Sequence, residues 1–147
     1  MTVLSLALLL LFVASIGAAT AAPAPKPTPK AKLPPYRIVR MILARDNGDG
    51  RNGAQVRGFK TTDNPLHCVV QLSQGKPGLK VAFRWYAVNA GGGKNYLIKE
   101  DVFVTEDKNR TVGNALRLER PWPPGKYRVT ASVQGTKLVT LVDFLIK

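Results

Sequence analysis

Cysteine and histidine are almost absent from this 147-residue chain, which contains one of each, Cys68 and His67. A single cysteine cannot form an intramolecular disulfide, so Cys68 is interpreted as a small buried hydrophobic residue. A catalytic thiolate would need a base within hydrogen-bond distance, and on a strand His67 would point to the opposite face. One histidine is also too few for a histidine-cluster metal site, and it weakens the case for a catalytic triad.

Acidic side chains are scarce as well. The chain has 22 basic and 9 acidic side chains, which gives a formal net charge of +13. Such a balance favours anionic partners, among them acidic polysaccharides and lipid surfaces. The alternative is that Lys and Arg on outward strand positions keep a secreted domain soluble. The basic residues form no dense run and nothing resembles a nucleic-acid-binding motif, so no nucleic acid partner is expected.

Patterns that bind metals or support acid–base chemistry are missing too. The loop at residues 46–53 invites comparison with a calcium loop, but Gly48 and Gly50 stand where oxygen ligands are required. The adjacent carboxylates at 100–101 and 106–107 flank turns and alternate across faces, and we interpret them as a solvated rim. The sequence therefore predicts no catalytic residue, no metal and no cofactor.

Charge is also missing from residues 2–22, which are rich in Leu, Ala and Val. The tripeptide Ala19-Thr20-Ala21 fits a signal peptidase site, which makes residues 1–21 a signal peptide cleaved before Ala22. However, no Lys or Arg precedes the apolar stretch and three lysines follow it, the reverse of the usual charge bias. The alternative is an uncleaved anchor over residues 3–24. Either interpretation predicts a secreted or periplasmic protein, with membrane contact only through an uncleaved N-terminal segment.

Proline alternates with small and basic residues over positions 22–35. This composition prevents helix and sheet formation and favours extended polyproline II structure. We therefore expect a semi-rigid spacer at 22–35, followed by one folded domain at 36–147.

From residue 36 onward the pattern is that of β-strands. The clearest example follows Trp122-Pro123-Pro124-Gly125, where apolar and polar residues alternate from Lys126 to Val133. Turn residues separate similar segments, and no helical periodicity appears. The pattern predicts an all-β, antiparallel sandwich of seven or eight strands. The expected strands are 36–45, 54–62, 66–72, 80–88, 96–105, 112–119, 126–133 and 137–146.

Three structural residues carry a resemblance to a known architecture. Tyr127 follows Gly125 by two residues at the start of a strand, which resembles the tyrosine corner of immunoglobulin-like sandwiches. Trp85, on the expected third clear strand, resembles the buried Trp of such cores. The stretch 59–147 thus resembles bacterial immunoglobulin-like modules of exported proteins. The resemblance implies the fold and leaves the function open.

An immunoglobulin-like strand order would place 80–88, 126–133 and 137–146 in one sheet. Arg and Tyr beside aliphatic side chains are typical of a binding surface, so Arg84, Tyr86, Arg128 and Leu141 are the candidate binding residues. Two alternatives remain: the facing could be shifted by one residue, or the Pro-rich segment could cover the face. The outer face of this sheet would carry Arg84, Tyr86, Val88, Arg128, Val139, Leu141 and Leu145.

Three functional hypotheses follow. The first is a non-enzymatic module that binds an envelope component or another protein through this outer face. The second is a protease inhibitor that presents the loops at 46–53 or 89–95 to an active-site cleft. The third is electrostatic association with anionic glycans or lipids, which needs only the net charge.

Overall fold

The computed structural model describes residues 34–147 of the chain. The expected signal peptide or anchor, and most of the expected spacer, lie outside the described residues. The described part is all-β, and it contains no helix long and apolar enough to cross a membrane. Its strands are β1 (Ile38–Asp46), β2 (Asn52–Val56), β3 (Gly58–Phe59), β4 (Leu66–Leu72), β5 (Lys80–Ala90), β6 (Gly93–Val104), β7 (Thr111–Leu116), β8 (Gly125–Val133) and β9 (Val139–Ile146).

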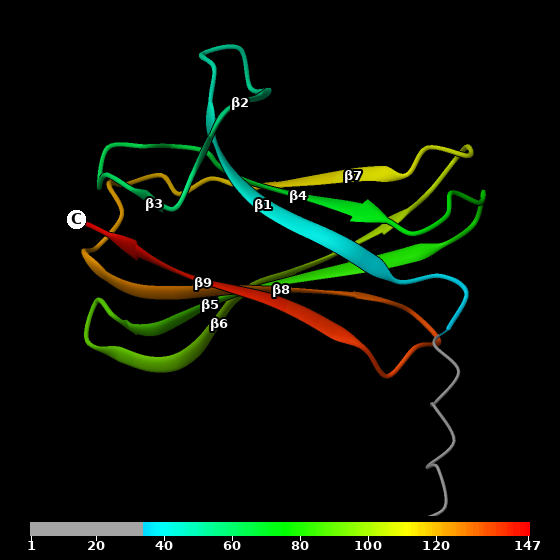
Figure 1. The fold of residues 1–147 in the computed structure, drawn as a ribbon. Helices are drawn as coiled ribbons and strands as arrows, with labels where there is room; N and C mark the ends of the chain where they lie inside the picture. The colour runs from blue at the N-terminus through cyan, green and yellow to red at the C-terminus, as the bar shows by residue number, and fades with distance from the viewer. Residues whose placement is uncertain (1–33) are drawn as a thin grey trace, which may run out of the picture. The chain divides into compact units, whose positions relative to one another are not determined.

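The strands form two sheets that pack face to face (Figure 1). One sheet has the order β2-β1-β4-β7 and the other has the order β3-β9-β8-β5-β6. Neighbouring strands are antiparallel except β3 and β9, which are parallel. The predicted immunoglobulin-like sandwich is therefore confirmed, and β5, β8 and β9 share a sheet as expected.

The region 54–62, expected as one edge strand, forms two strands in different sheets. Val56 pairs with β1 in the first sheet, and Gly58 pairs with Leu145 of β9 in the second. A Cβ atom on Gly58 would lie 2.9 Å from the Leu145 carbonyl oxygen, so the close approach of the two backbones requires glycine here. This change of sheet raises the number of strands to nine.

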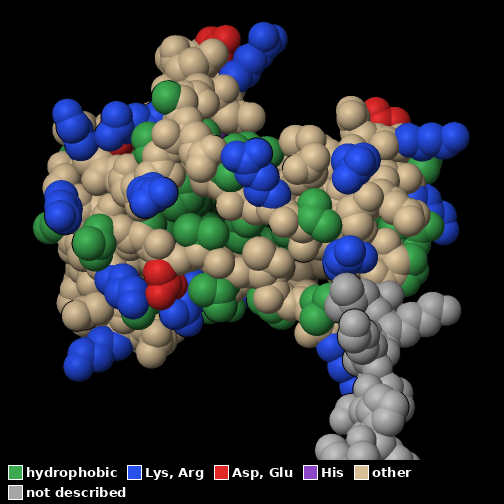
Figure 2. Space-filling view, viewed as in Figure 1, with side chains coloured by type: hydrophobic (Ala, Val, Ile, Leu, Met, Phe, Trp, Pro, Cys, Tyr) green, Lys and Arg blue, Asp and Glu red, His purple; other side chains and the backbone are tan. Residues whose placement is uncertain are grey.

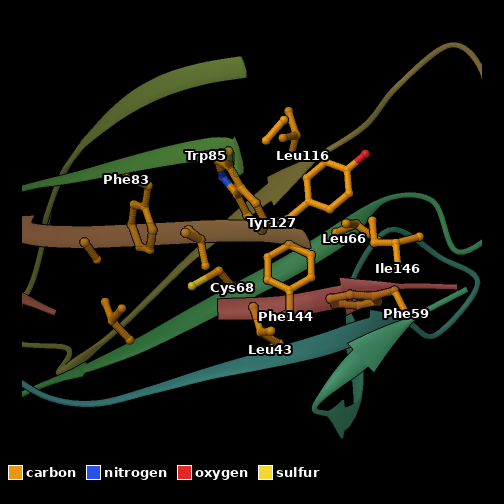
Figure 3. Packing of buried hydrophobic residues seen from close by; sticks show 14 of the residues in the cluster. Leu43, Phe59, Leu66, Cys68, Phe83, Trp85, Leu116, Tyr127, Phe144 and Ile146 are labelled. Atoms are coloured by element: carbon orange, nitrogen blue, oxygen red, sulfur yellow. The ribbon is translucent and has the colours of Figure 1, made fainter. Parts of the chain in front are cut away.

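Alternating side chains of the two sheets build the core between them. From the five-stranded sheet, Phe83, Trp85, Tyr127 and Phe144 point inward, where they meet Leu43, Leu66 and Cys68 of the other sheet (Figure 3). The aromatic rings contact one another: Phe144 stacks on Tyr127 with centroids 5.7 Å apart and meets Trp85 edge-on at 6.2 Å. Leu138 precedes β9 and is exposed.

The entry to β8 is a corner held by Tyr127. Its hydroxyl donates a hydrogen bond of 2.7 Å to the carbonyl oxygen of Pro123, and its ring meets the buried Trp122 edge-on at 5.5 Å. Gly125 has a φ of 148°, and a Cβ there would lie 2.4 Å from the Asn89 carbonyl oxygen. Backbone conformation and space therefore both require glycine at this position.

Candidate functional site

The outer face of the five-stranded sheet brings the four candidate binding residues together. Residues directly opposite each other on antiparallel strands share a face. Tyr86 lies opposite Arg128, Arg84 lies opposite Thr130, and Thr130 in turn lies opposite Leu141. We define the outer patch as the side chains of Arg84, Tyr86, Leu97, Glu100, Val102, Lys126, Arg128, Val139, Leu141, Asp143 and Leu145.

Aliphatic side chains occupy the two outer columns of the patch. Leu97 and Val102 lie on β6, and the other column is on β9. Their exposed fractions are 41% for Leu97 and 52% for Val102, and on β9 they range from 47% to 57%. Val88, also expected on this face, sits at an irregularity in the pairing of β5 with β8 and is half-buried. The β9 column consists of Val139, Leu141 and Leu145.

Charged side chains of the patch are paired across strands. The Arg84 guanidinium lies 2.8 Å from a carboxylate oxygen of Glu100 on β6. Arg128 donates two hydrogen bonds, of 2.6 and 3.0 Å, to the carboxylate of Asp143 on β9, a bidentate arrangement. The ammonium of Lys126 lies 3.1 Å from the same carboxylate. These cations are therefore already engaged by carboxylates of the patch itself.

The pairing shifts the acid–base behaviour of these groups. The hydrogen bonds from Arg128, joined by Lys126, lower the pKa of Asp143 to about 2. The hydrogen bond to Glu100 raises the pKa of Arg84, and the one to Asp143 raises that of Arg128. At neutral pH Asp143 is therefore ionised, and Arg84 and Arg128 are protonated.

Leu97, Glu100 and Val102 were missed by sequence reasoning. They belong to β6, whose place in the sheet was not assigned from the sequence. The triple glycine at 91–93 has the composition of a hairpin loop, and such a loop places the following strand beside β5. That signal could have added the three residues to the predicted face, because Tyr86 lies opposite Leu97, and Arg84 lies opposite Glu100.

The loop at residues 46–53, one of the two loops considered for protease inhibition, is organised by Asp46. One carboxylate oxygen accepts hydrogen bonds from the backbone N–H groups of Gly48 and Gly50, at 2.8 and 3.4 Å. The other lies 2.9 Å from Nε2 of His67, a side chain that is 3% exposed. The His67 hydrogen bond lowers the pKa of Asp46. His67 thus anchors this loop from β4.

Cys68 lies on the opposite side of β4 from His67, inside the core. Burial raises the pKa of its thiol to about 12. At neutral pH the sulfur is protonated and shielded from solvent, so it behaves as a small hydrophobic group in the packing.

The second loop considered, at 89–95, borders a hollow of about 310 Å³ at the end of the sandwich. Tyr96 stands exposed at its rim, while Trp122 and Tyr127 are buried at its base. The hollow is lined mainly by apolar side chains, with Arg120 as a cation among them.

Basic residues outside the patch are scattered. Figure 2 shows Lys and Arg distributed over the visible face, with hydrophobic atoms between them and few acidic groups. Within residues 34–147, no group of three or more His, Cys, Asp or Glu side chains is placed to hold a metal ion. The positive charge is therefore diffuse in this view.

Comparison with models of known protein families finds no match, and no curated protein matches the sequence. Among solved structures, an immunoglobulin-like protein from Pseudomonas aeruginosa matches with a TM-score of 0.50. The sequences are 15% identical, and the match covers 76% of this chain and 96% of that chain. At this identity the likeness concerns the fold, and it shows that residues of this chain adopt an immunoglobulin-like sandwich.

Proposed function

We propose that the chain is an exported, non-enzymatic module that binds another protein or an envelope component through the outer patch. The supporting observation is the exposure of five aliphatic side chains on the same sheet face that carries Tyr86. Exposed aliphatic side chains gathered on one face together with Tyr and Arg are typical of a binding surface.

Burial of the aliphatic columns would supply the affinity. Removing a Leu or Val side chain from water contributes about 1.5–3 kcal/mol when burial is complete. Leu141 and Val139 are about half exposed, so each still has a large part of that contribution to gain. Tyr86 adds an aromatic ring of the type that dominates binding energy at protein interfaces.

The paired charges of the patch determine which kind of partner surface would fit it. Arg84 and Arg128 keep their carboxylate partners within the patch. Binding therefore leaves no unpaired charge to bury, provided that the partner does not compete for the arginines. A largely apolar and electrically balanced protein surface fits this face better than a polyanion does.

Export is supported by the sequence of the N-terminal region. The uncharged stretch at 2–22, with its small-residue site before Ala22, has the pattern of a leader that is removed on secretion. The spacer at 22–35 would then hold the domain away from the surface from which it emerges.

Electrostatic association with anionic glycans or lipids is the second candidate function. The formal net charge of +13 favours it. Most of the positive charge lies outside the patch, which holds only three of the 22 basic side chains and two of the nine acidic ones. Heparin retention that disappears at moderate salt would support this candidate. Retention that persists in high salt would contradict it.

The proposed function is tested by capture of partners from envelope extract with chemical cross-linking. The patch variant carries Val139→Asp and Leu141→Asp, and the matched control carries Val39→Asp, at an exposed valine of β1 outside the patch. We expect cross-linked products with the wild type and the control, and a loss of more than about tenfold with the patch variant. Equal capture by all three proteins would remove the patch as the binding site.

A further inference from the structure

We propose that the hollow between the loop at 89–95 and the segment before β8 binds a small organic carboxylate with an aromatic body. None of the residues that line this hollow belongs to the outer patch, so the proposal is independent of the proposed function. It follows from an exposed tyrosine on the inward side of a strand, a cation without an acidic partner and a buried donor without an acceptor.

Tyr96 lies on the inward side of β6 and yet remains exposed. It lies opposite Ala87, a buried residue of the core, and residues directly opposite each other on antiparallel strands share a face. Its side chain is nevertheless 64% exposed. Asn95, which precedes it, has a φ of 50°, a conformation that is uncommon for residues other than glycine and costs free energy. The chain thus accepts a strained residue and leaves an inward tyrosine open to solvent at the rim of the hollow.

Arg120 gives the hollow a positive charge. It is the only charged residue among those that line it, and within residues 34–147 no carboxylate lies within ion-pair distance of its guanidinium. Glu119 and Lys94, which flank lining residues, carry opposite charges and offset each other. Burial raises the pKa of Tyr127 and the charge of Arg120 partly offsets this rise, so the guanidinium lies near the phenol. A carboxylate in the hollow would therefore gain the ion pair that Arg120 lacks.

The segment that carries Arg120 is fixed on both sides. Asn64 accepts a hydrogen bond of 3.1 Å from the backbone N–H of Leu118 and donates one of 2.6 Å to its carbonyl oxygen. The backbone N–H of Trp122 donates a hydrogen bond of 2.9 Å to the carbonyl oxygen of Thr61. Because the backbone on either side of Arg120 is already held, a ligand has little of it to order.

Trp122 places a buried N–H group at the base of the hollow. Its side chain is 1% exposed, and among the described residues no acceptor lies within hydrogen-bond distance of its Nε1. The other tryptophan, Trp85, donates its Nε1–H to Asn114. A buried donor without a partner is unfavourable, so a shift of the Trp122 indole towards a ligand oxygen would be favoured.

The hollow has the size and the lining of a site for a small molecule. Its volume of about 310 Å³ is at the lower end of the range for such sites, about 300–1,000 Å³. Apolar side chains form most of the wall, and the rings of Tyr96, Trp122 and Tyr127 belong to it. These rings favour a flat aromatic body, and the single cation favours a carboxylate at one end of the ligand.

Titration of the isotope-labelled full chain with naphthoate tests the proposal, with NMR detection of the indole N–H signals of the two tryptophans. A Trp122→Phe variant assigns the two signals. We expect the Trp122 signal to shift with a Kd of about 1 mM or lower, and the Trp85 signal to shift much less. Naphthamide, which has the same ring and no charge, should bind at least about tenfold more weakly.

Two arginine variants separate the hollow from the net charge. Arg120→Gln should weaken naphthoate binding at least about tenfold. Arg117→Gln removes the same charge from an exposed residue outside the hollow, and its Kd should stay within about twofold of the wild type. The Val139→Asp, Leu141→Asp variant keeps every lining residue and should bind nearly as well as the wild type.

The proposal is overturned if Arg120→Gln weakens binding no more than Arg117→Gln does, because net charge would then attract the anion. Naphthamide that binds as tightly as naphthoate would overturn it as well, and so would a Trp122 signal that stays in place at about 10 mM naphthoate. A loss of binding in the Val139→Asp, Leu141→Asp variant would place the site on the outer patch instead.

Discussion

The indole Nε1 of Trp85 donates a hydrogen bond to the Oδ1 of Asn114, and this bond joins the two sheets. Asn114 lies on β7, 5% exposed, and its amide nitrogen donates a 3.0 Å hydrogen bond to Asp101 of β6. Lys99 lies 3.1 Å from the same carboxylate. A polar chain thus runs from the centre of the core to the sandwich edge, with Asn114 satisfying the buried indole.

Replacement of the Asn114 side chain should show how much the stability of the fold depends on this hydrogen bond. In Asn114→Ala the Trp85 N–H keeps its burial and loses its acceptor, which costs about 1–3 kcal/mol of the free energy of unfolding. Asn109→Ala, in the exposed turn before β7, is the control and should change it by less than about 0.5 kcal/mol. Urea unfolding followed by tryptophan fluorescence measures both. Equal losses of unfolding free energy in the two variants would show that the buried hydrogen bond stabilises the fold no more than the exposed Asn109 side chain does.

A second prediction concerns the corner at the start of β8. Tyr127→Phe removes the hydroxyl that donates to Pro123 and leaves the ring packing intact. The expected loss is about 0.5–1.5 kcal/mol of unfolding free energy. Tyr96→Phe removes a hydroxyl from a side chain that is 64% exposed, and it should be almost neutral. A Tyr127→Phe protein as stable as the wild type would contradict the role of the corner.

Two glycines with positive φ separate the effects of space and conformation. Gly125→Ala must push a Cβ against the Asn89 carbonyl oxygen and the Ala90 side chain, so we expect a loss of more than about 3 kcal/mol. Gly135 has a φ of 84° with no atom near its missing Cβ, so Gly135→Ala should cost only about 1–2 kcal/mol through conformational strain. Urea midpoints compare the two, and a similar cost at both sites would show that the clash relaxes freely.

The ion pair of Asp143 makes the stability depend on pH. The pKa of Asp143 is about 2 in the folded protein and 3.8 ordinarily. A lowered folded-state pKa contributes stability above the unfolded-state pKa, and that contribution disappears as the pH falls from about 4 towards 2. The wild type should therefore lose stability more steeply in this range than Asp143→Asn.

Because Asp143 is partly exposed, the difference should stay below about 1 kcal/mol at neutral pH and shrink in about 1 M salt. Urea midpoints between pH 2 and pH 7 provide the measurement. Parallel curves for the two proteins would show that the pair does not stabilise the fold.

Local patterns in the sequence were enough to predict much of the sandwich. The strand at 66–72 is bounded by proline before it and by polar turn residues after it, and β4 has the expected limits. Alternation in β5 and β8 correctly assigned the inward side of Trp85 and Tyr127, because both strands bury one face.

What the sequence did not predict depends on contacts between distant segments. Asn114 gives no local sign that it will be buried, since its partners lie on β5 and β6. The pairing of Arg84 with Glu100 depends on the register of a hairpin, and the change of sheet between β2 and β3 depends on the position of β9. The binding role of the outer patch and the cleavage of the leader stay predictions.

The parallel pairing of β3 with β9 has a consequence for the order of folding. Lys147 donates its backbone N–H to the carbonyl of Phe59 and accepts one from Thr61, so β9 lies between β3 and β8 as an interior strand. The segment that leaves the ribosome last among the described strands thus fills a gap between strands made earlier. Until β9 has been made, β3 has no partner strand and the backbone edge of β8 that faces β9 is unpaired, so this sheet cannot be completed before the last of the described strands is available.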